Sequence, residues 1–299
     1  METTPLIDLA EPRQTIGVTG ASGFLGHRVV EEIIKAGARA CCYSRNAPPG
    51  MQGCTEVRPF RYSGINVHGV NAIVHLAGES IFGLWTETKK KRILESRRDG
   101  TQAVVDSILA AGEDGPKTLI CASAIGFYGD TGEQTVDEDA PPGKDFLTEV
   151  TQVWEKEALR AESGGVRVVI LRFGIILARE GGILKKLRPL FLAGLGSSLG
   201  DGRQWVSWIH AGDAANLVLH ALRHPGMSGV YNAVAPHPLR QIDFAEALAR
   251  KWQRKVRFNV PAWLLKSAVG ELATVMLSSQ KVVSKRLQET GFQFFYPEL

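Results

Sequence analysis

Three glycines near the start of the chain have the spacing of a phosphate-binding turn. Residues 15–26 read TIGVTGASGFLG, in which Gly20, Gly23 and Gly26 link a short apolar run to an amphipathic one. Gly20 would let the chain leave a strand in a conformation that is costly for a residue with a Cβ atom. Gly23 would let backbone N–H groups approach phosphate oxygens, and Gly26 would let a helix pack closely on the sheet. The pattern predicts that a dinucleotide pyrophosphate binds at the positive end of that helix.

The end of the second predicted strand indicates which dinucleotide binds. Proteins that bind NAD usually place an acidic residue there, where it accepts hydrogen bonds from the ribose hydroxyls. This chain reads ARACCYSRN and ends in Ser44 and Arg45, with no carboxylate nearby. A guanidinium pairs with a 2′-phosphate and stacks on adenine, whereas a carboxylate would repel the phosphate. Arg45 therefore favours NADP(H), and the alternative is an ordinary surface arginine after a strand.

Strands and helices alternate through the first two thirds of the chain. The predicted strands are 15–19, 39–43, 55–58, 72–76, 117–122 and 166–172, and the predicted helices are 24–36, 86–111 and 147–163. Several of these strands are almost continuously apolar, as expected for a parallel sheet covered on both faces. We therefore expect an α/β fold with a doubly wound, Rossmann-type parallel sheet, which binds ligands at the carboxyl ends of its strands.

The composition changes after Arg172, where glycine and basic residues become frequent. The runs 205–210 and 211–225 look like a strand and a helix that return to the sheet. We predict a flexible extension at 1–14, a dinucleotide-binding domain at 15–176 plus 205–234, and a smaller, discontinuous substrate lobe at 177–204 plus 235–299.

Composition excludes several classes of protein. The 299 residues are 44% hydrophobic and 22% charged, and 35 basic side chains against 31 acidic ones are too small an excess to indicate nucleic-acid binding. No apolar run is long enough to span a bilayer, so no membrane is expected. The four cysteines have no CxxC spacing, and we expect them to be reduced in a cytoplasmic protein. No Cys/His cluster has metal-ligand spacing, so no metal is expected.

Several motifs together resemble the extended short-chain dehydrogenase/reductases of the nucleoside-diphosphate-sugar epimerase type. These are TGASGFLG, HLAGE at 75–79, SAIGFYG at 123–129, RFGIIL at 172–177 and WIHAGD at 208–213. The segments WTETKKKRILESR, GLGSSLGDGRQWVSWIH and GFQFFYPEL resemble one atypical branch, the "epimerase family proteins", with YfcH-like, SulA-like and Giant Chloroplast-like members. The branch pattern usually continues a little beyond YPEL, so we expect that this chain ends early. The resemblance implies NADP(H) binding and leaves the substrate unassigned.

The resemblance also implies a set of cofactor contacts. The pyrophosphate turn would comprise Gly20, Ala21, Ser22, Gly23, Phe24 and Leu25, with Ser44 and Arg45 at the 2′-phosphate. The residues that would border the rest of the cofactor are Leu76 and Ala77 at the adenosine half, Arg92 and Arg97 on the following helix, and Ser123 and Ile176 at the nicotinamide end.

The chain departs from the family in its catalytic residues. Ordinary members use a YxxxK pair, in which the lysine lowers the pKa of the phenol, but none of the five tyrosines here is followed by lysine four positions later. Ser123 and Tyr128 are the candidate replacements, and the alternatives are a packing serine and a tyrosine that only shapes the pocket. Glu79 and Glu155 lie near the expected cleft and have structural roles as their alternative.

Two functions fit these observations. The first is an NADP(H)-dependent oxidoreductase or epimerase-like enzyme, acting on a small polar, phosphorylated or nucleotide-linked substrate near Lys185, Lys186 and Arg188. The second is a non-catalytic NADP(H)-binding regulatory or scaffold protein, related to division proteins of plastids. Either would be a monomer or a homodimer formed through the helices at 86–111 and 147–163.

Overall fold

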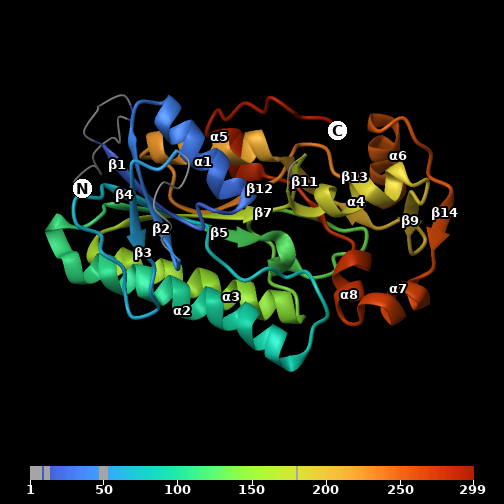
Figure 1. Cartoon of the computed structure of the whole chain (residues 1–299), viewed down its shortest axis with the longest axis horizontal. Helices are drawn as coiled ribbons and strands as arrows, with labels where there is room; N and C mark the ends of the chain where they lie inside the picture. The colour runs from blue at the N-terminus through green and yellow to red at the C-terminus, as the bar shows by residue number, and fades with distance from the viewer. Residues whose placement is uncertain (1–8, 10–13, 47–52, 180) are drawn as a thin grey trace.

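A parallel sheet of seven strands forms the centre of the molecule (Figure 1). The computed structural model describes residues 9, 14–46, 53–179 and 181–299. The strands follow the order β12-β7-β5-β4-β1-β2-β3, and every neighbouring pair is parallel. Their bounds are β1 Thr15–Thr19, β2 Arg39–Ser44, β3 Glu56–Pro59, β4 Ala72–His75, β5 Thr118–Ala124, β7 Arg167–Phe173 and β12 Gly229–Ala233.

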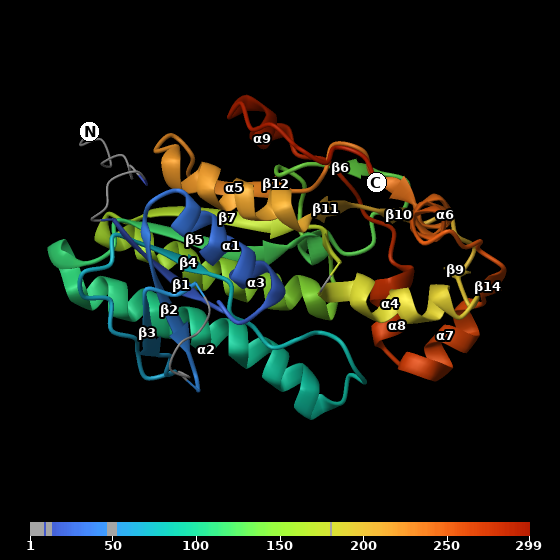
Figure 2. The same ribbon diagram turned by 45° about the horizontal axis from the view of Figure 1, so that its top comes forward.

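Helices cover both faces of this sheet (Figure 2). On one face α1 (Phe24–Lys35) packs against α5 (Ala211–Arg223), and on the other α2 (Glu87–Ala111) packs against α3 (Phe146–Leu159). Every residue of β1 and β7 is buried, as expected for strands at the centre of a parallel sheet that is covered on both faces. The predicted doubly wound α/β fold is therefore confirmed.

The order of strands reverses direction between β1 and β4. The chain runs outward through β2 and β3 on one side of β1, and through β5, β7 and β12 on the other side of β4. Such a reversal leaves a crevice at the carboxyl ends of the two adjacent strands. The glycine turn and the loop after β4 both start there.

Further elements surround the far end of the sheet. They are β6 Thr135–Val136, β8 Ile175–Ala178, α4 Gly182–Leu192, β9 Ser197–Leu199, β10 Trp205–Val206, β11 Trp208–His210, β13 Leu239–Arg240, α6 Gln241–Lys251, β14 Phe258–Val260, α7 Ala262–Val269, α8 Leu272–Leu277, β15 Lys281–Val282 and α9 Lys285–Glu289. Strand β14 pairs with β9, so the segments 177–204 and 235–299 are in contact. A second apolar core, containing Phe191, Trp208 and Phe244, lies in this region. The exact domain boundaries stay a prediction.

The run 205–210 was expected to return to the main sheet but does not join it. Strand β11 pairs with β8 in a separate two-stranded sheet, and β12 takes the edge position beside β7. Most of the predicted extension 1–14 lies outside the described residues. Within it, Leu9 is buried in the main core and Gln14 accepts a backbone hydrogen bond from Arg39.

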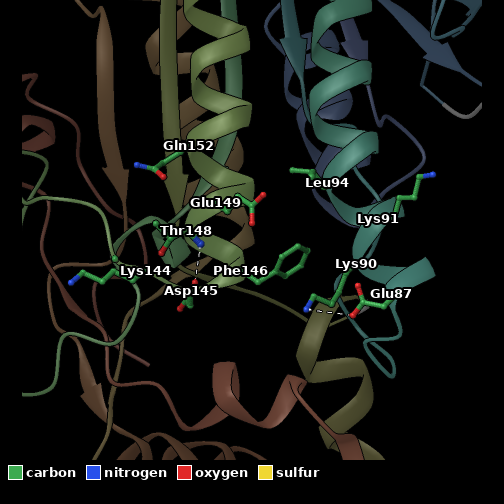
Figure 3. Close-up of a pocket in the computed structure, with 11 residues that line it drawn as sticks. Glu87, Lys90, Lys91, Leu94, Lys144, Asp145, Phe146, Thr148, Glu149 and Gln152 are labelled. Atoms are coloured by element: carbon green, nitrogen blue, oxygen red, sulfur yellow. Dashed lines mark hydrogen bonds and ion pairs between the residues drawn. The ribbon is translucent and has the colours of Figure 1, made fainter.

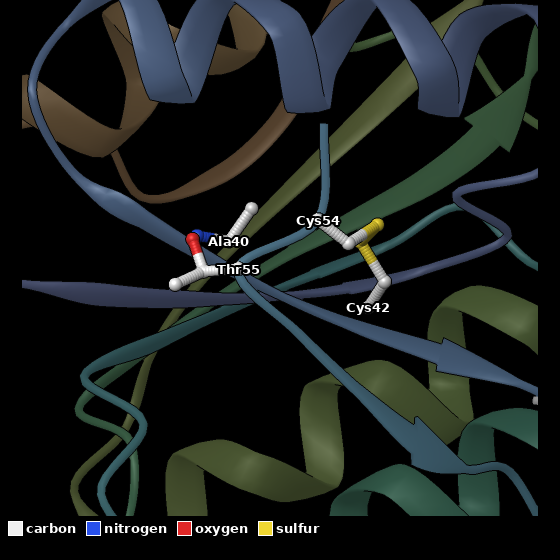
Figure 4. Close-up of a disulfide and its surroundings, with 4 residues drawn as sticks. All are labelled: Ala40, Cys42, Cys54 and Thr55. Carbon is white, nitrogen blue, oxygen red and sulfur yellow. A yellow bond between two sulfur atoms is a disulfide. The ribbon is translucent and has the colours of Figure 1, made fainter. Parts of the chain in front are cut away.

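The prediction that all four cysteines are reduced is wrong. Cys42 and Cys54 form a disulfide with a Cα–Cα distance of 5.9 Å (Figure 4), while Cys41 and Cys121 are free and buried. The pair is 12 positions apart in sequence and becomes adjacent because β2 and the chain before β3 run side by side. Spacing alone does not reveal that proximity.

Candidate functional site

The glycine turn has the geometry that its spacing predicts. Gly20 has φ of 69°, and a Cβ atom there would lie 2.8 Å from the carbonyl carbon of Leu76. A Cβ atom on Gly26 would collide with the carbonyl oxygen of Gly20. Helix α1 begins after Gly23 with no side-chain cap and no acidic residue in its first turn. Its first N–H groups are therefore available to an anion.

A cavity of about 270 Å³ lies beside this turn, at the carboxyl ends of β1, β2 and β4. Seven of the predicted cofactor residues line it: Gly20, Ser22, Gly23, Ser44, Arg45, Leu76 and Ala77. The other lining residues are Tyr43, Asn46, Phe60, Tyr62, Gly78, Glu79 and Ser96. The structure thus brings the phosphate turn and the predicted 2′-phosphate residues to one hollow.

Two of these additional lining residues are aromatic side chains that follow β3 in the sequence. Phe60 and Tyr62 follow β3 directly and their rings meet edge to face, with centroids 5.9 Å apart. Aromatic side chains at the carboxyl end of a strand are placed to contact a flat base. Their place in the cavity wall could not be predicted, because no local pattern encodes the order of strands that brings β3 beside β2.

A buried histidine supports the loop that borders the cavity. The Thr19 hydroxyl lies 2.7 Å from Nδ1 of His75 and also accepts hydrogen bonds from the amides of Leu76 and Ala77. The hydroxyl proton therefore points to Nδ1, and His75 carries its own proton on Nε2, 3.1 Å from the Thr101 hydroxyl. Burial, aided by the positive charge of Arg97, lowers the pKa of His75 to about 4, so the ring is neutral.

Arg97 supports the same loop from α2. Its guanidinium donates to the carbonyl oxygens of Glu79 and Ile93 at 3.1 Å and stacks 5.0 Å from the centroid of the Trp154 ring. Burial lowers the pKa of Arg97 to about 10, which leaves it charged at neutral pH. Neither Arg97 nor Arg92 lines the cavity, so their predicted contacts with cofactor stay predictions.

The two candidate catalytic residues belong to one buried network. Ser123 donates to Glu155 at 2.6 Å, and Arg172 forms a two-pronged ion pair with Glu155 at 2.8 and 2.7 Å. Arg172 also donates to the Tyr128 hydroxyl at 2.9 Å, and Tyr128 donates to Asn232 at 2.7 Å. Arg172 was not among the predicted site residues, and its RFG motif carried no chemical signal beyond the resemblance.

This network limits the proton chemistry available. Ser123 and Tyr128 are 3% and 4% exposed, and each already donates its proton to a partner. Burial raises the pKa of Tyr128 despite the adjacent Arg172 guanidinium, so the phenol stays protonated at neutral pH. The network holds neutral hydroxyls in place and offers no phenolate base.

The remaining predicted contacts lie around the start of α1. Ile176 is partly exposed in β8 and pairs with Ile209. A Cβ atom on Gly181 would collide with Phe24, so Phe24 packs closely against the chain that leads into α4. The cavity beside the glycine turn includes neither Ile176 nor Phe24.

A larger hollow of about 580 Å³ lies between the first turns of α2 and α3 (Figure 3). It contains both signs of charge: Lys90 lies 3.9 Å from Glu87, and Asp145 accepts from the amide of Thr148 at the start of α3. None of the predicted site residues lines it. In the described part of the chain, no three His, Cys, Asp or Glu side chains are grouped to hold a metal ion, and no helix is long and apolar enough to cross a membrane.

Known proteins resemble this chain over nearly its whole length. It is 38% identical over 295 residues to the chloroplastic epimerase family protein SDR39U1 homolog of Arabidopsis thaliana, covering 96% of this chain and 84% of that protein. It is 36% identical over 290 residues to the epimerase family protein YfhF of Bacillus subtilis, covering 95% of each.

Solved structures show the same likeness. Human epimerase family protein SDR39U1, crystallised with NADPH, superposes with a TM-score of 0.85 at 29% identity, covering 95% of this chain and 96% of that one. The nucleoside-diphosphate sugar epimerase from Corynebacterium glutamicum gives a TM-score of 0.78 at 29% identity, covering 99% of this chain and 58% of that one.

Two family models match separate parts of the chain. A domain of unknown function, DUF1731, matches residues 260–299, and the NAD dependent epimerase/dehydratase family matches residues 16–233. The resemblance to the "epimerase family protein" branch is therefore confirmed, and the chain belongs to the NAD dependent epimerase/dehydratase family.

Proposed function

We propose that this protein binds NADP(H) in the cavity at the carboxyl ends of β1, β2 and β4, in preference to NAD(H). The observation that carries the proposal is the placement of Ser44 and Arg45 in the wall of the same cavity as the glycine turn. The structure of human SDR39U1 with NADPH supports the choice of cofactor. Among the described residues that line the cavity, Glu79 is the one carboxylate. Lys89 neutralises it at 2.6 Å and lowers the pKa of its carboxyl.

The reaction that this site supports best is hydride transfer between NADP(H) and a small polar or nucleotide-linked substrate. The name of the Corynebacterium glutamicum relative supports a nucleotide-linked substrate. Lys185, Lys186 and Arg188 are exposed on α4 and are available to a phosphate or carboxylate. Since no YxxxK pair exists, Ser123 and Tyr128 would act as neutral hydrogen-bond donors, without phenolate chemistry. To do so, each hydroxyl would have to turn its proton from its present partner, Glu155 or Asn232, to a substrate oxygen.

A second candidate is a non-catalytic NADP(H)-binding protein that acts through partners. The buried network favours it, because both hydroxyls are enclosed and already donate to Glu155 and Asn232.

Replacing Arg45 by glutamate tests the cofactor proposal. We expect NADPH to raise the melting temperature of the wild type far more than NADH does. In Arg45→Glu, affinity for NADPH should fall by about 10- to 100-fold, because a charge-assisted contact becomes a repulsion, while affinity for NADH changes little. Isothermal titration calorimetry gives both dissociation constants.

Arg39→Glu is the matched control. Arg39 is exposed at the amino end of the same strand, β2, so the variant makes the same charge change away from the cavity. It should bind NADPH like the wild type. Equal wild-type affinities for NADPH and NADH would reject the proposal.

Single-turnover oxidation of NADPH separates the two candidate functions. A panel of carbonyl compounds and sugar nucleotides would be tested with Ser123→Ala and Tyr128→Phe beside the wild type. Turnover that these variants lose while still binding NADPH supports the enzyme. Bound NADPH with no turnover across the panel supports the non-catalytic protein.

A further inference from the structure

Large apolar side chains are exposed on two segments, 190–199 and 250–270, that lie at the end of the molecule opposite β3 (Figures 1 and 2). These side chains are Leu190, Leu192, Leu195, Phe258, Trp263 and Leu264. In the described part of the chain they are six of the thirteen large apolar side chains that are exposed, and Trp263 is 68% exposed. Single apolar side chains on a surface are normal, but a cluster of them marks an interaction site.

Hydrogen bonds join the two segments into one surface. Strand β14 pairs in parallel with β9. Just before this pairing, the amide of Arg257 donates to the carbonyl of Gly196 at 2.9 Å, and the guanidinium of Arg254 donates to the carbonyl of Leu192 at 3.3 Å. Helix α7 follows β14 directly, so its exposed side chains belong to the same end of the molecule.

The same two segments are strongly basic. They contain six basic side chains and no acidic one, whereas the other residues of the chain contain 29 basic and 31 acidic side chains. All six basic side chains are exposed: Arg250, Lys251, Arg254, Lys255, Arg257 and Lys266. Among the described residues, only Arg250 of this set has a carboxylate partner, Glu246 at 3.8 Å. Five positive charges therefore face solvent beside the exposed apolar side chains, and we call the two segments together the apolar–basic surface.

We propose that the apolar–basic surface binds the surface of an anionic lipid membrane. The leucine, phenylalanine and tryptophan side chains would enter the boundary between headgroups and acyl chains. The lysine and arginine side chains would lie at the level of the lipid phosphates, with their apolar stems beside the inserted rings. Binding of this kind needs no spanning helix, so the lack of a long apolar run does not oppose it.

Other occupants fit this surface less well. A second copy of the chain would bring the same positive charges against these ones, and like charges across an interface repel. Single-stranded nucleic acid would satisfy the charges, but it binds by stacking bases on aromatic rings. Four of the six exposed apolar side chains are leucines, which offer no flat ring to a base.

Co-sedimentation with lipid vesicles tests the charges of this surface. We expect the protein to bind vesicles of phosphatidylcholine mixed with phosphatidylserine, and to bind pure phosphatidylcholine at least about tenfold more weakly. The double variant Lys255→Glu/Lys266→Glu should lower the partition coefficient for the anionic vesicles at least about tenfold. Arg39→Glu/Lys91→Glu is the matched control, since it makes the same charge change at exposed positions of β2 and α2, and it should bind like the wild type.

Fluorescence tests the apolar part of the surface. Phospholipids brominated in their acyl chains quench tryptophan side chains that enter the bilayer. We expect them to quench part of the emission of the wild type, and this part should be lost in Trp263→Phe. Trp263→Ala should also lower the partition coefficient severalfold, whereas Phe295→Ala, which removes a ring that is 72% exposed outside the apolar–basic surface, should not.

Absence of binding to the anionic vesicles overturns the proposal, and so does an equal loss in the two double variants. In the first case, a dimer in analytical ultracentrifugation that Trp263→Ala dissociates would assign the surface to a second copy. Binding of a single-stranded oligonucleotide that Lys255→Glu/Lys266→Glu abolishes would assign it to nucleic acid. The double variant should bind NADPH like the wild type, because both substitutions lie outside the cofactor cavity. Failure of the membrane proposal therefore leaves the proposed function untouched.

Discussion

Glu155 connects the residues that sequence analysis selected for chemistry. Its carboxylate accepts from Ser123 and forms the two-pronged pair with Arg172, which in turn contacts Tyr128. Glu155 and Arg172 side chains are 8% and 5% exposed, so each charge depends on the other for compensation. Removing one partner of such a pair leaves an uncompensated buried charge.

We therefore expect Glu155→Ala to lower the free energy of unfolding by about 3–5 kcal/mol, as measured by urea denaturation. Glu157→Ala is the control on the same helix. Glu157 pairs with Arg160 at 2.9 Å, but the Arg160 side chain is 41% exposed, and such a surface pair contributes about 0–1 kcal/mol. A loss of the same size in both variants would show that the buried Glu155–Arg172 pair contributes no more to the free energy of unfolding than a surface pair does.

At the scale of elements, the junction of β1 with β4 shapes the cofactor cavity. Thr19 ends β1, and its hydroxyl joins His75 to the amides of Leu76 and Ala77. Both strands were predicted from the sequence, because each is buried and contains β-branched apolar residues in a short run. The polar link between them could not be predicted, since it depends on the register that places Thr19 beside His75.

Replacing the Thr19 hydroxyl by a methyl group tests this link. Thr19→Val should lower the free energy of unfolding by about 1–3 kcal/mol, because it removes the side-chain partner of Nδ1 of His75 and of the Ala77 amide. It should also weaken dinucleotide binding, which calorimetry would measure. Thr118→Val is the matched control: Thr118 is equally buried in β5 of the same sheet, and its hydroxyl has no partner among the described residues. That variant should be neutral or slightly stabilising, and equal effects would contradict the role of Thr19.

At the scale of the whole molecule, the last residues of the chain return to the sheet domain. Both carboxylate oxygens of Asp213 accept a backbone amide, from Phe295 and from Tyr296, each at 2.9 Å. The Tyr296 ring lies 3.8 Å from that of His210, centroid to centroid. His210 caps α5 by accepting from the amide of Gly212, and Asp213, in the first turn of that helix, holds the terminal segment.

Asp213→Asn tests this attachment. The side-chain NH₂ group of asparagine would face one of the two backbone N–H groups. Two donors cannot hydrogen-bond to each other, so the terminal segment should detach. We expect the amides of Phe295 and Tyr296 to exchange with deuterium at least about tenfold faster. Asp201→Asn is the control, since Asp201 accepts one amide in an exposed turn where asparagine fits equally well. Unchanged exchange in Asp213→Asn would show that other contacts hold the segment.

The sheet, its covering helices and the phosphate turn could all be predicted from the sequence. These features depend on local patterns: apolar runs define the strands, and the Gly20 and Gly26 positions admit no side chain. The tertiary structure decided the Cys42–Cys54 bond, the aromatic pair Phe60–Tyr62 in the cavity wall and the Glu155–Arg172 network. The disulfide and the ion pair each join residues on different elements, and the aromatic pair enters the cavity wall because β3 lies beside β2. Strand order and register, which no local pattern encodes, decide these contacts.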